Sequence, residues 1–258
     1  MSSVSCSGVG SCAAGGFYED GSAQFQGFVV SEKNGTWAAA QDVPGLGTLN
    51  VGGFAQVTVV SCSPAGSCAA GGFYHTGPSE VQPFVVTRPS GTWGTASPVK
   101  GVLALNAGQD AFITSLSCAS GGNCSAAGSY TDSLGHGWPF VVSEKNAKWG
   151  TAVQAPGVSK LSGVGRFGEI NSVSCASPGN CAAAGQYDNF ASHSQAFVMT
   201  QHNGTWSAAV NVPGQSALDK DHSSFAAVVS CHAPAGCTAT GAYHDASGRQ
   251  ETFVLTTK

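Results

Sequence analysis

Paired cysteines are the most regular chemical feature of the sequence. In each of five pairs the two cysteines stand six positions apart, and the pairs recur every 56 or 57 residues. A structural zinc site needs four ligands, whereas each pair offers two. Free thiols in a reducing cytosol are the other alternative. The pattern favours one disulfide within each pair and an oxidising compartment, with the partners Cys6 and Cys12, Cys62 and Cys68, Cys118 and Cys124, Cys175 and Cys181, and Cys231 and Cys237.

Acidic residues that depart from the repeated pattern indicate a second possible chemistry. Glycoside hydrolysis uses two carboxyl groups, one as acid and the other as nucleophile or base. The candidates lie in segments that lead into the innermost strands, and they are Asp110, Glu169, Asp219 and Asp221. A glycoside hydrolase is therefore an alternative function. The sequence has no G-x-S-x-G motif and no glycine-rich segment leading into a helix, so we expect no serine nucleophile of that type, no phosphate loop and no cofactor.

Aromatic and polar residues that recur together favour sugar binding. An aromatic ring can pack against the apolar face of a sugar while carboxylates and amides bind its hydroxyls. We predict the ligand-binding residues Tyr18, Asp20, Asn50, His75, Asn106, Asp110, Asp132, Trp138, Asp188, Asp219 and Asp245. The competing interpretation is structural, because a tyrosine present in every copy is typical of a core and an aspartate beside glycine or serine is typical of a turn.

These residues are distributed over a tandem repeat. The copies span 3–57, 58–113, 114–170 and 171–226, and a fifth, 227–258, lacks the part with Trp and Val-Pro-Gly. In the first copy we expect strands over 4–6, 12–18, 28–31 and 37–43, because aromatic and β-branched residues there are bounded by Gly, Pro, Asn and Ser. Asn34-Gly35 is the preferred pair for a two-residue hairpin turn before the fourth strand.

A four-stranded meander repeated five times predicts an all-β protein, a five-bladed β-propeller of 1–258 with one disulfide per blade. A β-solenoid is the alternative architecture. Since the last copy is short, closure of the ring would depend on packing and strand contacts between 1–6 and 253–256.

Two sets of variable polar loops should lie at the same end of the strands. One set connects the second and third strands of each copy, beginning near 19, 75, 131, 188 and 244, and the other leads into the next copy over 49–53, 105–110, 161–169 and 218–222. We call this end the loop face. Binding residues accumulate on the loops of a rigid scaffold, so we expect any local function there.

Composition excludes several classes of protein. Lys and Arg total 10 and Asp and Glu total 14, giving a net charge of −4, while hydrophobic residues make up 42%. A chain with so few charges is not disordered, and it offers no basic surface for nucleic acid. No apolar run is long enough for a membrane helix, and the start of the sequence lacks a signal-peptide pattern, so an exported form would be the mature one.

The motif SVSCASPGNCAAAGQY, followed by FVMTQHNGTW and VPG over 172–214, resembles a tandem repeat of extracellular proteins from actinobacteria. The resemblance covers nearly the whole chain. It implies secretion and a propeller-like fold, and it brings no catalytic residues. Together with the loop residues it favours a secreted, non-catalytic, lectin-like protein, a monomer whose partner is a glycan or another small polar ligand. The alternatives are the glycoside hydrolase and a structural or protein-binding propeller without a small ligand.

Overall fold

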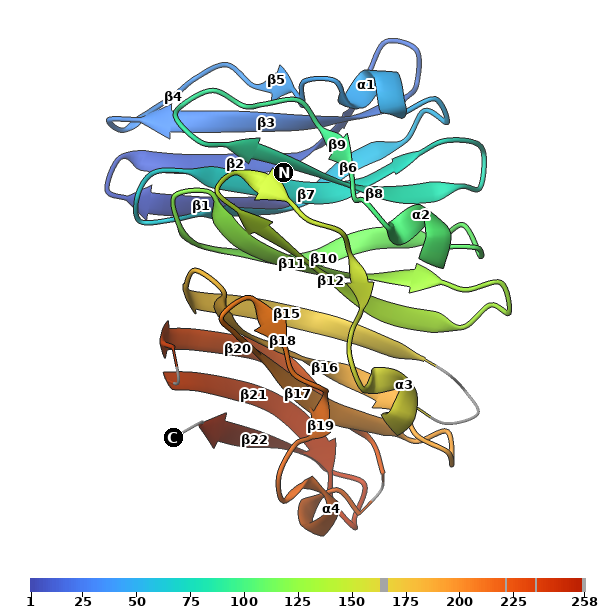
Figure 1. Ribbon diagram of the computed structural model, residues 1–258. Coiled ribbons are helices and arrows are strands. Elements are labelled where there is room, and N and C mark those ends of the chain that lie inside the picture. The colour runs from blue at the N-terminus through green and yellow to red at the C-terminus, as the bar shows by residue number, and fades with distance from the viewer. Residues whose placement is uncertain (163–166, 221, 235, 257–258) are drawn as a thin grey trace.

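A computed structural model describes residues 1–162, 167–220, 222–234 and 236–256. Its strands form five antiparallel sheets, one for each copy of the repeat (Figure 1). Sheet 1 contains β1 (Ser3–Gly8), β2 (Ser11–Glu19), β3 (Phe25–Lys33), β4 (Thr36–Trp37) and β5 (Gln41–Asp42), followed by α1 (Leu46–Leu49). Sheet 2 contains β6 (Ala55–Cys62), β7 (Cys68–His75), β8 (Val81–Arg88) and β9 (Ser97–Pro98), followed by α2 (Val102–Leu105).

The remaining sheets repeat this order. Sheet 3 contains β10 (Ala111–Ser120), β11 (Asn123–Thr131), β12 (Gly137–Lys145), β13 (Lys148–Trp149) and β14 (Val153–Gln154), followed by α3 (Val158–Leu161). Sheet 4 contains β15 (Gly168–Ser177), β16 (Asn180–Asp188), β17 (Ser194–His202), β18 (Thr205–Trp206) and β19 (Val210–Asn211), followed by α4 (Gln215–Leu218). Sheet 5 contains β20 (Ser224–Ala233), β21 (Gly236–His244) and β22 (Gln250–Thr256). The all-β prediction is confirmed.

The fourth expected strand of each copy is only partly formed. In sheet 1, β4 pairs with the end of β3 and β5 pairs with its middle, so two short pieces replace one strand. The chain then leaves the sheet, and Val43 and Leu46 pack in the core formed with sheet 2. Burial of these apolar side chains explains why the pairing with β3 ends at Asp42.

All five cysteine pairs form disulfides within their copies, as the spacing predicts. Each disulfide joins directly opposite residues of the first two strands, for example Cys6 on β1 and Cys12 on β2. The same pairing recurs in the other four copies. Each disulfide therefore stabilises one hairpin and crosslinks no two sheets.

The sheets pack face to face in chain order, from sheet 1 at the top of Figure 1 to sheet 5 at the bottom. Small residues on the second strand allow this close approach. A Cβ on Gly15 would lie 2.5 Å from Cγ1 of Val57 in the next sheet. The fully buried Phe84, Phe140 and Phe197 lie in three successive hydrophobic clusters of the core.

Serine hydroxyls join neighbouring sheets at equivalent positions. Oγ of Ser5 accepts the backbone N–H of Cys62 at 2.9 Å, and Oγ of Ser61 accepts that of Cys118 at 3.0 Å. The same bond joins Ser117 to Cys175 and Ser174 to Cys231. These bonds satisfy backbone donors that would otherwise be buried without partners.

The two ends of the stack are open. Among the described residues, β1 pairs only with β2 and β22 pairs only with β21, so the sheet pairing expected between 1–6 and 253–256 is not formed. Val4 on β1 is 54% exposed, whereas its equivalent Val60 in sheet 2 is 4% exposed. Val254 on β22 is 71% exposed, whereas its equivalent Val85 is 1% exposed. The expectation of strand contacts between the ends was therefore wrong, because an outer face of each end sheet remains in solvent.

Candidate functional site

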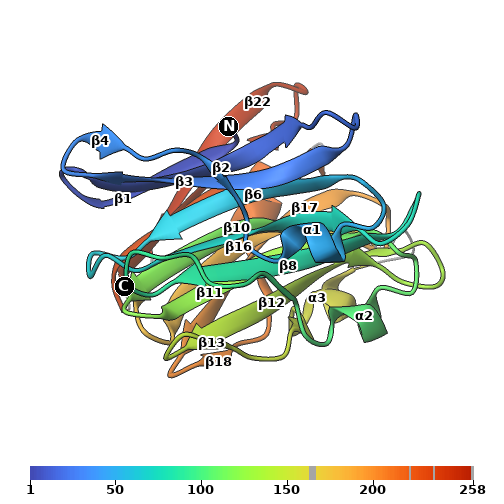
Figure 2. The same ribbon diagram turned by 90° about the horizontal axis from the view of Figure 1, so that it is seen from above.

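The loop face exists as a structural feature. The helices α1 to α4 lie at the same end of the strands (Figure 1), and Figure 2 shows α1, α2 and α3 together on one side. The loops that connect the second and third strands of each sheet lie at this same end of the strands, because the two strands are antiparallel. None of the helices in the described ranges is long and apolar enough to cross a membrane.

Aspartates predicted to bind ligand hold their own turns. In Asp20, Asp132 and Asp245 one carboxylate oxygen accepts backbone N–H groups from the second and fourth following residues, at 2.8 to 3.1 Å. In sheet 4 this role belongs to Asn189. The predicted residue Asp188 precedes it at the end of β16, where burial raises the pKa of its carboxyl. These contacts are those of Asx turns.

The turn of sheet 3 also uses Trp138. Its Nε1–H donates to Oδ2 of Asp132 at 2.9 Å, and Nδ1 of His136 lies 3.0 Å from the same oxygen. Burial raises the pKa of Asp132, but its hydrogen bonds with Trp138 and His136 outweigh burial and bring the pKa well below the usual range. Trp138 is 8% exposed. The Trp138 side chain is therefore buried and hydrogen-bonded within the turn.

Asn50, Asn106 and Asp219 follow the short helices and are buried. The side-chain amide of Asn50 donates to the carbonyl oxygen of Phe25, and the amide of Asn106 donates to that of Val81, both at 3.0 Å. Asp219 accepts the backbone N–H of Ser223 at 2.8 Å. These side chains fix the connections between sheets.

Tyr18 differs from its equivalents in the inner sheets. Tyr74, Tyr130 and Tyr187 are buried, whereas Tyr18 is 41% exposed because none of the described sheets covers its side of sheet 1. Its O–H donates to Oδ1 of Asp42 at 2.7 Å. That hydrogen bond is the main reason why the pKa of Tyr18 is raised.

The carboxylates of the hydrolase alternative are dispersed. Asp110 is exposed and Asp219 is buried, and Asp221 lies outside the described residues. Glu169 is half-buried, its Oε1 accepts a hydrogen bond from the Gln186 amide at 2.8 Å, and burial raises its pKa. It lines a shallow depression of about 420 Å³, and it is the one acidic residue among the side chains described there: Glu169, Asn171, Gln186, Phe225 and Ala227.

Five rings gather on the loop face where sheets 1 and 2 meet. Phe54 is central, with ring centroids 5.1 Å from Phe25, 5.4 Å from Phe73, 6.2 Å from Phe17 and 5.2 Å from His75. Phe17 is 38% exposed, and the other four are partly exposed. We call these five residues the aromatic cluster. Partly exposed apolar rings on a rigid scaffold are typical of a binding surface.

Backbone geometry explains why these rings meet. The N–H of Phe25 donates to the carbonyl oxygen of Gly53, and the N–H of His75 donates to that of Phe54, both at 2.9 Å. Gly52 is required for this crossing, since a Cβ there would lie 2.5 Å from the carbonyl oxygen of Gly77. Gly53 has a φ of +79°, which favours glycine.

Sequence reasoning included His75 and missed the four phenylalanines. The sequence did contain a signal for two of them. Phe54 aligns with Asp110 of the third copy and Phe73 aligns with Ser129, so both phenylalanines differ from the residue at the same position of that copy. Exposure distinguishes this cluster from the buried rings.

A groove between sheets 3 and 4 lies at the opposite end of the strands. Its volume is about 360 Å³, and its polar lining includes Ser125, Ser143 and Gln201. The amide of Gln201 donates to Oγ of Ser143 at 2.8 Å and to the carbonyl oxygen of Gly204 at 3.2 Å. The amide N–H groups of Gln201 are therefore already paired within the protein. Over the described part of the chain, no three His, Cys, Asp or Glu residues gather as a metal site would require.

Comparisons with known proteins find structures of similar fold and no matching family. Neither a protein-family model nor a curated protein matches the chain. A crystal structure of a protein of unknown function from Dyadobacter fermentans is similar, with 11% identity, a TM-score of 0.51, and coverage of 96% of this chain and 73% of that one. A PL25 ulvan lyase, a polysaccharide lyase, has 11% identity and a TM-score of 0.50, and the match covers 96% of this chain and 64% of the lyase. At such identities the likeness shows the fold alone.

Proposed function

We propose that this chain is a non-catalytic carbohydrate-binding protein whose ligand packs on the aromatic cluster of the loop face. The observation that carries the proposal is the five-ring arrangement around Phe54, open to solvent at Phe17. The carbon-bound hydrogens on the flat face of a sugar can pack against such rings, while neighbouring polar groups bind its hydroxyls. His75 supplies a ring whose nitrogens have no hydrogen bond to any described residue.

Binding is favoured over hydrolysis by the placement of the carboxylates. A glycoside hydrolase needs two carboxyl groups facing one bond. In the depression that contains Glu169, the other described polar side chains are the amides of Asn171 and Gln186. The fold likeness to a polysaccharide lyase shows that a related architecture occurs in a carbohydrate-active enzyme, and it transfers no residue to this chain.

We also propose that the five sheets are blades of an open, propeller-like arrangement in a secreted protein. Face-to-face packing in chain order and the repeated strand order support this interpretation. Five disulfides are chemically suited to an oxidising compartment.

The test is a glycan array followed by calorimetric titration of the strongest ligand. Phe17→Ala removes the most exposed ring of the cluster and should weaken binding about tenfold, about 1.4 kcal/mol. Phe190→Ala is the matched control, because Phe190 is 72% exposed in the β16–β17 turn of the same face and forms none of the cluster's ring contacts. Absence of binding on the array, or equal losses in both variants, would refute the proposal.

A further inference from the structure

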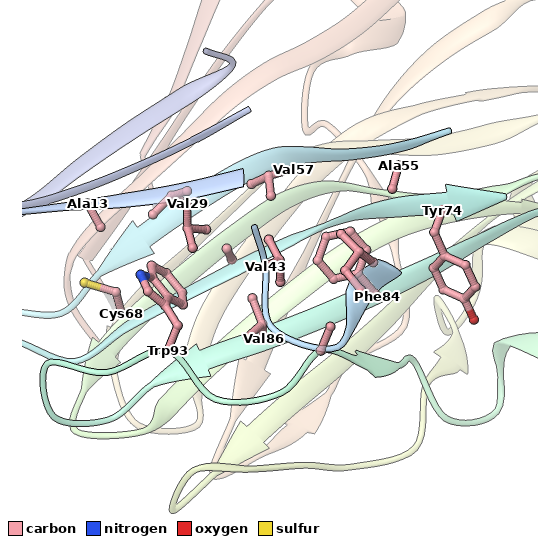
Figure 3. Close-up of a cluster of buried hydrophobic side chains, with 14 of the residues drawn as sticks. Ala13, Val29, Val43, Ala55, Val57, Cys68, Tyr74, Phe84, Val86 and Trp93 are labelled. Carbon is pink, nitrogen blue, oxygen red and sulfur yellow. The ribbon is translucent and has the colours of Figure 1, made fainter. Parts of the chain in front are cut away.

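Arg88 has an unusual environment at the end of β8. It lies opposite Cys68 in the strand register and is 5% exposed. One guanidinium nitrogen donates to Sγ of Cys68 at 2.9 Å, and the guanidinium carbon lies 5.7 Å from the ring centroid of Trp93. Figure 3 shows Cys68 and Trp93 side by side in this core. A cation is thus buried against one sulfur of a disulfide.

No carboxylate in the described part of the chain pairs with the positive charge of Arg88. Within the described ranges it forms no ion pair, and its Nε is buried without a hydrogen-bond partner. Burial lowers the pKa of Arg88, which reflects the cost of holding the charge away from water. The face of Trp93 provides only part of the missing stabilisation, because a cation–π contact replaces a counter-ion incompletely.

The other four copies provide internal controls for this arrangement. The residues equivalent to Arg88 are Glu32, Glu144, Gln201 and Thr257, none of which is cationic. In sheet 4, Gln201 lies opposite Cys181 as Arg88 lies opposite Cys68. The same disulfide hairpin therefore occurs with and without a buried cation beside it.

Reduction would supply the anion that Arg88 lacks. A thiolate at Cys68 would lie within hydrogen-bonding distance of the guanidinium, and charge-assisted hydrogen bonds are stronger than neutral ones. A neighbouring cation lowers the pKa of a thiol, and a thiol of lower pKa is the better leaving group in disulfide exchange. We propose that Cys62–Cys68 is a redox-active disulfide, reduced by dithiols before Cys6–Cys12, Cys118–Cys124 and Cys175–Cys181, whose cross-strand neighbours Glu32, Glu144 and Gln201 are not cationic.

The exchange follows from the exposure of the two cysteine residues. A dithiol attacks as its thiolate on Sγ of Cys62, which is 9% exposed, rather than on Cys68, which is 1% exposed. The bond between the two cysteines breaks, a mixed disulfide forms with Cys62, and Cys68 departs as a thiolate beside Arg88. The second thiol of the dithiol then loses its proton and displaces Cys62, which takes up a proton. Two electrons pass to the protein, and the dithiol becomes a cyclic disulfide.

The test measures the reduction equilibrium of each disulfide in the folded protein. Native chain is equilibrated, from both the oxidised and the reduced side, in mixtures of reduced and oxidised dithiothreitol. It is then quenched in acid, alkylated, digested and examined by mass spectrometry. The equilibrium constant for reducing Cys62–Cys68 should exceed that of Cys175–Cys181 at least tenfold, a difference of about 30 mV.

Arg88→Gln introduces the residue found in sheet 4, and it should bring the two constants within threefold of each other. Gln201→Arg is the converse variant, and it should raise the constant of Cys175–Cys181. This second variant keeps the test decisive if Arg88→Gln does not fold. The proposal is overturned if Cys62–Cys68 is no more reducible than the others in the native chain, or if a folded Arg88→Gln variant leaves its constant unchanged.

Discussion

Ser61→Ala tests how the sheets are held together. Oγ of Ser61 accepts the N–H of Cys118 in the next sheet at 3.0 Å, and Cys118 is 7% exposed. Alanine fits the same space but leaves this N–H buried without an acceptor. The desolvation of an unsatisfied backbone donor costs about 1 to 3 kcal/mol. We therefore expect the free energy of unfolding to fall by about 2 kcal/mol.

The matched control is Ser230→Ala. Ser230 occupies the equivalent position in sheet 5, where it is exposed and donates or accepts no hydrogen bond across to another described sheet. Substitutions at such positions usually change the free energy of unfolding by less than about 0.5 kcal/mol. Urea denaturation of native chain and both variants, followed by circular dichroism, provides the comparison. Equal effects of the two substitutions would show that the hydrogen bond between sheets does not account for the loss, and the reasoning would be refuted.

Two further predictions concern a buried carboxyl group and a close backbone contact. Glu144 is 3% exposed, its Oε2 has no hydrogen-bond partner among the described residues, and burial raises its pKa above the ordinary 4.5. Since the charged form of Glu144 is disfavoured only in the folded state, Glu144→Gln should raise the free energy of unfolding at pH 7, as measured by urea denaturation. This gain should vanish below about pH 4, where the carboxyl is protonated in both states. A gain that does not change with pH would contradict the reasoning. Gly72→Ala would place a Cβ against the carbonyl oxygen of Gln56, so we expect the free energy of unfolding, measured by the same urea denaturation, to fall by about 3 kcal/mol or more. Gly77→Ala is the control, and it should leave the free energy of unfolding nearly unchanged because a Cβ there meets no close contact.

Local spacing predicted the features that depend on neighbouring residues in one copy. Cysteines six positions apart, such as Cys6 and Cys12, lie directly opposite each other across a tight hairpin. The strand expected over 12–18 is also confirmed, because β2 spans Ser11–Glu19. These predictions succeeded because hairpin register and side-chain size are encoded over short distances.

The roles of the loop residues were harder to predict, because one residue type serves several purposes. Asp20 and Asp132 have the chemistry of sugar ligands, yet their oxygens accept backbone N–H groups of the following turn. The arrangement around Phe54 depends on contacts between two copies, which no single repeat specifies. The open ends follow from the absence of a neighbouring sheet, so the exposure of Val4 was not visible in its local sequence.

The most direct test of the proposed function is a crystal structure of the chain soaked with the strongest ligand from the glycan array. We predict a sugar ring lying on Phe17 and Phe54, with a hydroxyl within hydrogen-bonding distance of His75. A sugar bound instead in the groove lined by Ser125 and Gln201, or cleaved beside Glu169, would contradict the assignment of binding to the aromatic cluster.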